Sequence, residues 1–149
     1  MQRFIHSLEE DYVKFDISQD PEYLDIAADI IGVPTFDADM TYTIGVFDSN
    51  TEFQAVILFN NWEEKNVSIH VASVSPKWAT REVLRVAFTY AFLELGVQRV
   101  TGTVRENNTK ARALNLRLGF KQEGEMRQFY DTGESDIIFG MTKDECKWI

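Results

Sequence analysis

The sequence predicts a mixed α/β domain with about seven strands and three or four helices. Residues 42–74 form three apolar strands in hairpin succession, separated by short polar turns. Residues 67–105 then have the order strand, long helix, strand, and residues 99–130 repeat the order strand, helix, strand. Tight turns make neighbouring strands antiparallel, whereas a long helical crossover allows parallel neighbours. A mostly antiparallel sheet with one crossover region is therefore expected, in a single domain that spans residues 1–149.

The first half of the chain carries one predicted helix and four of the strands. Residues 12–17 alternate polar and apolar side chains, as a half-buried strand does. Asp20 and Pro21 begin a helix, because proline suits the first helical position, and Gly32 ends it. The buried stripe of this helix consists of Leu24, Ala27, Ala28 and Ile31. The remaining strands are expected at residues 42–47, 53–59 and 67–74.

The second half carries the two other helices and three strands. Residues 78–95 have apolar side chains at helical spacing and stop at Gly96, which predicts the longest helix. Asn108 has the chemistry of a helix N-cap, and Gly119 that of a C-cap. The apolar positions of this shorter helix are Ala111, Leu114 and Leu118. Strands are expected from residue 99 to about 104, at residues 121–130 and at residues 136–141.

The composition is typical of a globular protein. Of 149 residues, 44% are hydrophobic and 13% aromatic, which argues against disorder. No apolar run approaches the roughly 20 residues of a membrane span, and the N-terminus turns acidic where a signal peptide needs an apolar stretch. One cysteine and two histidines give neither a disulfide framework nor a recognisable metal site. We therefore expect a cytoplasmic protein without a metal and without a membrane partner.

The charge is unevenly distributed along the chain. The net charge is −9, which argues against nucleic acid as the main partner. Residues 1–75 contain 3 Lys and Arg against 14 Asp and Glu, whereas residues 76–149 contain 12 against 10. The two halves can therefore face different chemical partners.

A short set of residues in the second half resembles a known family. The motif combines Asn108 before a helix, the run Leu118-Gly119-Phe120 at its end, and Glu123-Gly124 followed by Arg127. This arrangement resembles the C-terminal half of GNAT-superfamily N-acetyltransferases, in particular the ribosomal-protein N-terminal type and small phage- and prophage-encoded proteins. The likeness extends from about Asn66 to the end of the chain.

The resemblance implies a GNAT fold with a mostly antiparallel seven-stranded sheet. It also implies transfer of an acetyl group from acetyl-CoA, as co-substrate, directly to a primary amine of a small molecule or peptide. In the family the pantetheine arm follows the strand expected here at residues 67–74, and the pyrophosphate lies at the N-terminus of the following helix. By this resemblance the cofactor-binding residues are Ser73, Val74, Lys77, Trp78, Ala79, Thr80, Arg81, Asn108 and Arg112.

The pyrophosphate turn departs from the family pattern. Aligned without gaps backwards from Tyr90-Ala91-Phe92, the slots for Gln or Arg, for Gly, and for Gly or Ala hold Ser75, Trp78 and Thr80. In a register shifted by a residue or more, Trp78 instead matches an aromatic that precedes the glycines in some relatives. Glycine permits close approach of the backbone to phosphate, and tryptophan does not obviously do so. Lys77, Arg81 and Arg85 place three cations around the start of the helix. They are either phosphate contacts that compensate for the lost glycine or solvated helix charges.

Catalytic residues are weakly specified, because thiol departure and amine attack need few side chains. The positions where family members often carry Tyr and Ser hold Asn115 and Ala111. His70 is the first candidate for a general base, with a hydrogen-bonded structural histidine as the alternative. Glu106 is the second candidate, with a helix-entry acid as the alternative. Tyr130 is more readily a packed aromatic and Cys146 a structural thiol.

Acidic residues suggest what the acceptor is. Asp37 and Asp39, in the loop before the first hairpin, are the candidates for substrate binding, with Asp29, Asp131 and Glu134 expected nearby. Acids around a cleft concentrate cations, so a cationic amine is the favoured acceptor, and simple solubility is the alternative role. The altered turn leaves a second functional class open: a weak or inactive GNAT-fold module that binds acyl-CoA or a protein partner. The sequence leaves the oligomeric state open.

Overall fold

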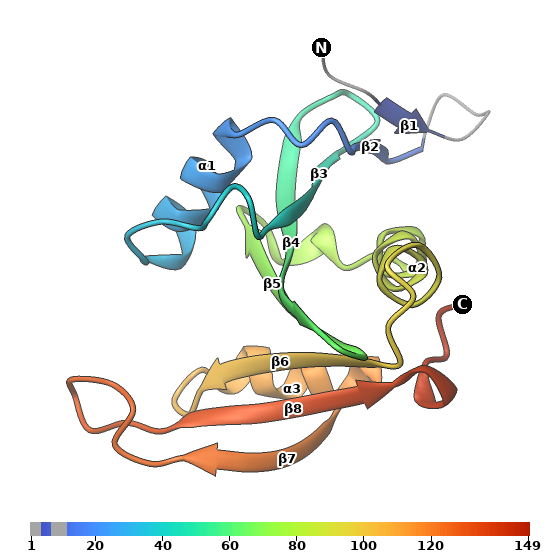
Figure 1. Ribbon diagram of the computed structural model, residues 1–149. Helices are drawn as coiled ribbons and strands as arrows, with labels where there is room; N and C mark the ends of the chain where they lie inside the picture. The colour runs from blue at the N-terminus through green and yellow to red at the C-terminus, as the bar shows by residue number, and fades with distance from the viewer. Residues whose placement is uncertain (1–3, 7–11) are drawn as a thin grey trace.

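The computed structural model describes residues 4–6 and 12–149, and these form one mixed sheet with helices on both faces (Figure 1). The strand order is β1-β2-β3-β4-β5-β6-β8-β7, and every neighbouring pair is antiparallel except β5 and β6. The strands are β1 Phe4–His6, β2 Lys14–Asp16, β3 Tyr42–Phe47, β4 Phe53–Glu63, β5 Asn66–Ser73, β6 Arg99–Arg105, β7 Lys121–Met126 and β8 Asp136–Thr142. All seven predicted strands are present, and β1 adds a short eighth in a segment whose sequence pattern is mixed.

Two of the three α-helices match their predicted ends closely. The helices are α1 Glu22–Ile31, α2 Arg81–Thr89 and α3 Thr109–Leu118. Asn108 caps α3, since its side chain accepts a hydrogen bond from the Ala111 amide at 3.2 Å. Gly119 and Gly32 end α3 and α1 at φ angles of 107° and 86°, which favour glycine. The predicted caps at both ends of α3 and at the C-terminus of α1 are confirmed, and at the start of α1 Pro21 is the N-cap residue rather than the first helical residue.

The long helix predicted at residues 78–95 is wrong at its start. Pro76–Trp78 instead form a 3₁₀ turn, begun by Ser75, whose hydroxyl accepts from the Lys77 amide at 3.2 Å. Thr80 then caps α2, accepting from the Val83 amide at 3.3 Å. Two caps in succession break the helix that apolar spacing alone predicts. At the other end, Tyr90–Glu94 continue α2 as a π-helical turn.

The predicted strand at residues 121–130 is too long. β7 ends at Met126, and the chain turns through Gln128, whose φ angle is 56°. The amides of Phe129 and Tyr130 both donate to the Glu134 carbonyl at 3.1 Å, which closes a compact loop. Tyr130 therefore lies in the β7–β8 loop rather than in a strand.

The sheet splits between its two parallel strands. β5 and β6 are paired only at Asn66–Arg99, Val67–Val100 and Ser68–Thr101, within the part of the chain that the structure describes. Beyond Ser68 and Thr101 the strands diverge, as the V between β5 and β6 in Figure 1 shows. β5 stays paired with β4, and β6 with β8. The backbone edges that face each other across the split therefore lack the hydrogen bonds of a continuous sheet.

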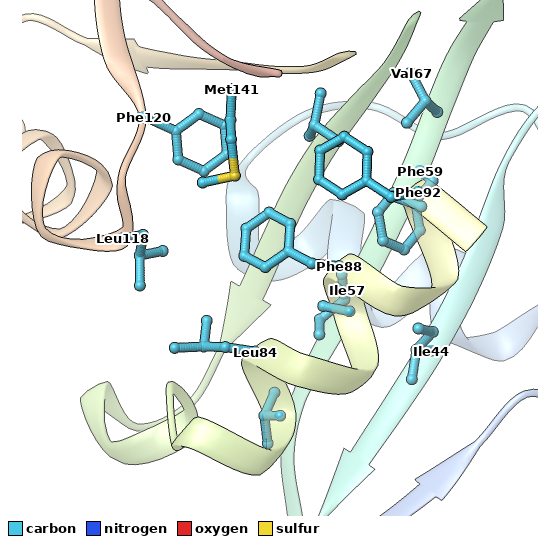
Figure 2. Close-up of a cluster of buried hydrophobic side chains, with 14 of the residues drawn as sticks. Ile44, Ile57, Phe59, Val67, Leu84, Phe88, Phe92, Leu118, Phe120 and Met141 are labelled. Atoms are coloured by element: carbon cyan, nitrogen blue, oxygen red, sulfur yellow. The ribbon is translucent and has the colours of Figure 1, made fainter. Parts of the chain in front are cut away.

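A hydrophobic core on the α2 and α3 face holds the two sides of the split together. Phe88 of α2 lies between strands of the first half and the segment after α3, where its ring centroid is 6.0 Å from that of Phe120 (Figure 2). Ile57 and Met141 are fully buried in the same cluster. A second cluster, built from α1 against Val56, Leu58 and Ala72, covers the opposite face. Burial of each large apolar side chain contributes roughly 1.5–3 kcal/mol, so these two clusters dominate the stability of the fold.

Candidate active site

A cleft of about 960 Å³ occupies the split between β5 and β6. Its walls come from both strands and Ile57 of β4, from the end of α1, from α2 and the 3₁₀ turn before it, from the length of α3 and from the β7–β8 loop. Neighbouring residues on a strand point to opposite faces of a sheet. Because the cleft lies between two strands, it receives side chains from both faces. We call the side toward α2 and α3 the apolar half of the cleft and the side toward α1 the polar half.

The apolar half is built from alternate residues of the two diverging strands. Ile69 and Val71 of β5 lie on the face covered by α2, and Gly102 and Val104 of β6 lie on the same face by register. Apolar and small side chains of the helices complete this half. They are Trp78, Leu84, Ala87, Phe88, Ala111, Leu114, Leu118 and Phe120. The result is a hydrophobic passage that runs from the helix N-termini toward the last β5–β6 pair.

The polar half is lined by the intervening residues of the same strands. His70 comes from β5, Thr103 and Arg105 come from β6, and Tyr130 comes from the β7–β8 loop. The end of α1 forms the opposite wall, which is apolar and consists of Ile30, Ile31, Gly32 and Val33. The two halves meet where the strands part, so a group bound on one face can reach a group bound on the other. Such an arrangement can bring two reactants together across the sheet.

His70 is the titratable side chain at this crossing whose geometry best fits a base. Its Nε2 is 2.9 Å from Oδ1 of Asn60 on β4, and its ring contacts Phe36 edge-on with centroids 5.7 Å apart. With the amide oxygen accepting, Nε2 carries the proton and Nδ1 keeps a free lone pair. Burial lowers the pKa of His70 below its ordinary value, and the Asp136 carboxylate opposes this in part. The imidazole is therefore neutral near pH 7.

Tyr130 and Asp136 form a second polar group on the same face. The Tyr130 hydroxyl donates to Asp136 Oδ1 at 2.9 Å, and the Arg105 guanidinium lies 3.9 Å from the centre of the Tyr130 ring. Asp136 is 3% exposed, and its charge reaches His70 across the cleft. Burial raises the pKa of Tyr130, so its hydroxyl stays protonated. This cluster supplies the polar half with a carboxylate that is shielded from solvent.

The predicted cofactor residues separate into two groups. Ser73, Trp78 and Asn108 line the cleft. Trp78 is only 9% exposed, so its indole packs into the wall and does not leave the open approach that glycine would. Val74, Ala79 and Thr80 do not line the cleft, and Thr80 serves as the α2 cap.

The start of α2 lies at the open end of the cleft and carries positive charge. Lys77 and Arg81 are both exposed there. Within the described residues, the amides of Arg81 and Glu82 have no hydrogen-bond partner, because the Thr80 side chain and carbonyl take only those of Val83 and Leu84. Free amides at a helix N-terminus favour an anion.

Glu106 and Arg112 are not among the residues that line the cleft. The Glu106 carboxylate accepts from the Ser135 amide at 2.8 Å and ties the end of β6 to the β7–β8 loop. Arg112 donates to the Glu106 carbonyl at 2.9 Å and braces the entry of α3. The structure thus gives both side chains a role in holding the loop between β6 and α3.

Asp37 and Asp39 are exposed and also do not line the cleft. The Asp37 carboxylate accepts from the Asp39 amide at 2.9 Å, which forms a local turn after α1. Any influence of these acids on a substrate acts through the electrostatic field around the mouth and not through contact.

Asn60, Asp136 and Gly102 are among the residues at the site that the sequence did not single out. Asn60 sits in a run of polar residues that looks like a turn, and Asp136 looks like the polar start of an apolar strand. Gly102 carried a signal that was present but unused: a glycine inside a strand of β-branched residues marks a bulge or a close approach. Among the described residues, no group of His, Cys, Asp and Glu is placed to hold a metal ion. Nor does any helix in residues 4–6 and 12–149 have the length and apolar character to cross a membrane.

The sequence is similar to a known protein over part of its length. No protein-family model matches the chain. A 72-residue stretch is 35% identical to YokL of Bacillus subtilis (strain 168), an uncharacterized N-acetyltransferase derived from the SPbeta prophage. The match covers 46% of this chain and 41% of that relative, so it spans less than half of either protein.

Solved structures match over nearly the whole fold. The ribosomal-protein-S5-alanine acetyltransferase of Vibrio fischeri aligns with a TM-score of 0.70 at 14% identity, covering 96% of this chain and 99% of that one. A spermidine N-acetyltransferase SpeG mutant of Vibrio cholerae aligns with a TM-score of 0.69 at 12% identity, covering 100% of this chain and 95% of that one. Mycobacterium smegmatis RimJ, in complex with CoA-disulfide, aligns with a TM-score of 0.66 at 13% identity, covering 97% of this chain and 88% of that one. The chain has the fold of the GNAT acetyltransferases, as predicted.

Proposed function

We propose that this protein is an N-acetyltransferase that moves an acetyl group from acetyl-CoA to a primary amine by direct transfer. The observation that carries the proposal is the cleft that crosses the sheet between β5 and β6, apolar on one face and polar on the other. An acyl thioester and an amine that enter from opposite faces meet at the crossing. Proximity of this kind can supply several kcal/mol of the barrier.

The donor fits the apolar half. Its pantetheine arm carries two amides, and the unpaired edges of β5 and β6 offer backbone N–H and C=O groups for them. The phosphates would lie at the start of α2, where the free amides of Arg81 and Glu82 and the side chain of Lys77 favour negative charge. The complex of the solved RimJ structure with CoA-disulfide supports this choice of donor.

His70 acts on the acceptor in this mechanism. A primary amine is mostly protonated at pH 7, with a pKa of about 10.4 for a lysine-like group. Neutral His70 accepts the proton that the nitrogen loses, either directly or through one water. The nitrogen then forms the new C–N bond and the C–S bond breaks, with the electron pair staying on sulfur. The second proton, which the nitrogen loses as the amide forms, goes to the departing thiolate, so coenzyme A leaves as the thiol.

The acceptor is further proposed to be cationic. The first half of the chain, which forms the α1 side of the cleft, has a large excess of acids, and Asp136 adds a buried carboxylate. Several solved structures of the same fold are named as spermidine N-acetyltransferases, which supports a small cationic amine. Acids near a cleft raise the local concentration of such amines.

A second candidate function is a binding module that holds acyl-CoA without transferring it. The buried Trp78 in the pyrophosphate turn favours this alternative, because glycine is the family residue there. A panel of amines, including polyamines, basic peptides and neutral amines, separates the two functions. Release of free coenzyme A with at least one amine supports the enzyme. Acetyl-CoA binding by calorimetry without release across the panel supports the module, and absence of binding at millimolar acetyl-CoA contradicts both.

A further inference from the structure

Gly102 is a buried glycine in the middle of β6, flanked by Thr101 and Thr103. A glycine inside a strand weakens the strand, because it has no side chain to pack and loses much conformational freedom on folding. Its φ angle lies outside the left-handed region, so the backbone does not require glycine. A Cβ atom added there would meet its nearest neighbours, Ile69 Cγ2 and Asn115 Nδ2, at 3.7 and 3.9 Å, which are ordinary contact distances.

The other glycines in central strands have a structural reason. A Cβ atom at Gly45 of β3 would lie 2.7 Å from the buried ring of Tyr23. A Cβ atom at Gly140 of β8 would collide with the Arg99 and Glu123 side chains, which pair across the sheet. At both glycines a neighbouring side chain fills the space that a Cβ atom would take. Gly102 differs, since an alanine methyl would fit the protein and would project into the cleft.

The position of Gly102 in the cleft says which part of a donor it meets. Ile69 and Gly102 are the first residues beyond the last β5–β6 pair, Ser68–Thr101, so they form the closed end of the apolar half. The phosphate-binding amides are at the other, open end. A donor that extends between the two therefore places its acyl group at the closed end. Asn115 faces this point from α3, and no hydrogen-bond partner for its side chain occurs in the described part of the chain.

We propose that Gly102 is the floor of the acyl site and keeps room for an acyl chain one carbon longer than acetyl, so that the enzyme uses propionyl-CoA as well as acetyl-CoA. This inference rests on the proposed acyltransferase function. Ile69 Cγ2 is the nearest atom to the Cβ position and Asn115 Nδ2 is the next. Most side chains that line this half are apolar, so an additional methylene gains about fourfold in binding when it leaves water. Gly102 is thus a specificity-determining residue for the donor.

The test compares both donors with the same amine. The wild-type protein is expected to show kcat/KM values for propionyl-CoA and acetyl-CoA within about threefold, because the longer chain fits without strain. Gly102→Ala should lower the propionyl-to-acetyl ratio about tenfold, since one misplaced methyl in an apolar pocket has an effect of this size. Gly124→Ala is the matched control, because its Cβ would also have ordinary space, 3.5 Å from Ile138, on a strand outside the cleft.

The outcomes separate this inference from the function on which it rests. Acetyl transfer by a wild-type protein that rejects propionyl-CoA by more than about a hundredfold overturns the inference and leaves the enzyme intact. An unchanged donor ratio in Gly102→Ala also overturns it. If the wild-type protein releases coenzyme A from neither donor, the proposed function itself is overturned. Thermal unfolding of each variant verifies folding, and the wild-type ratio decides the matter even if Gly102→Ala does not fold.

Discussion

The two halves of the cleft are built from the same two strands yet have opposite chemistry. On one face, Ile69 and Gly102 leave an apolar passage, and on the other, His70 and Thr103 present polar groups one residue further along each strand. In a continuous sheet these faces would never meet, because backbone hydrogen bonds close the gap. The split after Ser68 and Thr101 joins them. The alternation that gives every strand two faces therefore gives the cleft two chemically different sides, which the proposed mechanism assigns to donor and acceptor.

Removing the base of the polar half is expected to have the largest effect. His70→Ala should lower kcat by about 10²–10⁴, the usual contribution of a positioned general base. Acetyl-CoA affinity, a property of the apolar half, should change little. His70→Gln is the matched control, because its amide can still donate to Asn60 without acting as a base. Near-normal turnover in His70→Gln would make His70 a structural residue.

The second-largest effect is expected at the open end of the apolar half, where the phosphates are proposed to bind. Arg81→Ala should weaken acetyl-CoA binding by about 1–3 kcal/mol, the range for a lost charge-assisted hydrogen bond. Calorimetry with acetyl-CoA and with acetyl-pantetheine measures the effect, and only the first ligand should lose affinity. Arg117→Ala, at the far end of α3, should bind both ligands normally. Equal losses for the two ligands would place Arg81 away from the phosphates.

Asn108 tests whether one residue serves both the fold and the apolar half. Asn108→Ala should lower the free energy of unfolding by about 1 kcal/mol, because the Ala111 amide loses its acceptor. Asn108→Asp keeps the cap and adds a negative charge beside the cleft, so its melting temperature should be normal and its acetyl-CoA affinity reduced. Unchanged affinity in Asn108→Asp would limit Asn108 to capping.

The pKa of His70 links the polar half to pH. Because burial holds this pKa below about 6.5, kcat/KM should stay constant down to that pH and fall only below it. The unfolded chain binds the proton more readily than the folded one, so stability also falls as the pH drops below about 6.5. Asn60→Asp places a carboxylate on Nε2, which should move the acidic limb of the rate profile upward by about one unit. An unmoved limb would mean that His70 does not control the rate.

The outermost acids should matter least. Asp37→Asn with Asp39→Asn should lower kcat/KM for a polyamine by less than about threefold, and only at low salt, because both side chains are exposed and distant charges are screened. Steady-state rates from low salt to about 0.5 M measure the effect, with a neutral amine as control. A larger loss that persists at high salt would show direct contact with the acceptor.

The sequence predicted most of the fold, because local chemistry determines it. Asn108, Gly119 and Gly32 set helix ends that the structure confirms, and the apolar spacing of α2 placed its core correctly. The errors occur where local signals compete. Apolar spacing predicted that the helix of α2 begins at Trp78, although Ser75 caps a separate 3₁₀ turn and Thr80 caps α2 itself.

The site was less predictable, because it is assembled from strands distant in sequence. His70 gained a partner from Asn60 and an electrostatic neighbour from Asp136, and neither pairing follows from spacing along the chain. Glu106 is a candidate base by sequence, with a helix-entry acid as the alternative, and its hydrogen bond from the Ser135 amide does not follow from spacing either. The signal at Gly102 could be interpreted only once the neighbouring side chains were known.

The short parallel junction between β5 and β6 has a consequence for solvent exchange. From Ile69 onward, every second amide of β5 faces the split and has no partner strand. The intervening amides face β4 and are paired with it. Deuterium should therefore replace hydrogen rapidly along one edge of β5 and slowly along the other, within a single strand. A ligand whose amides bond to the unpaired edge of β5 would slow exchange at that edge and leave exchange at the other edge unchanged. The exchange rate of these amides thus reports whether a ligand occupies the cleft, without any measurement of turnover.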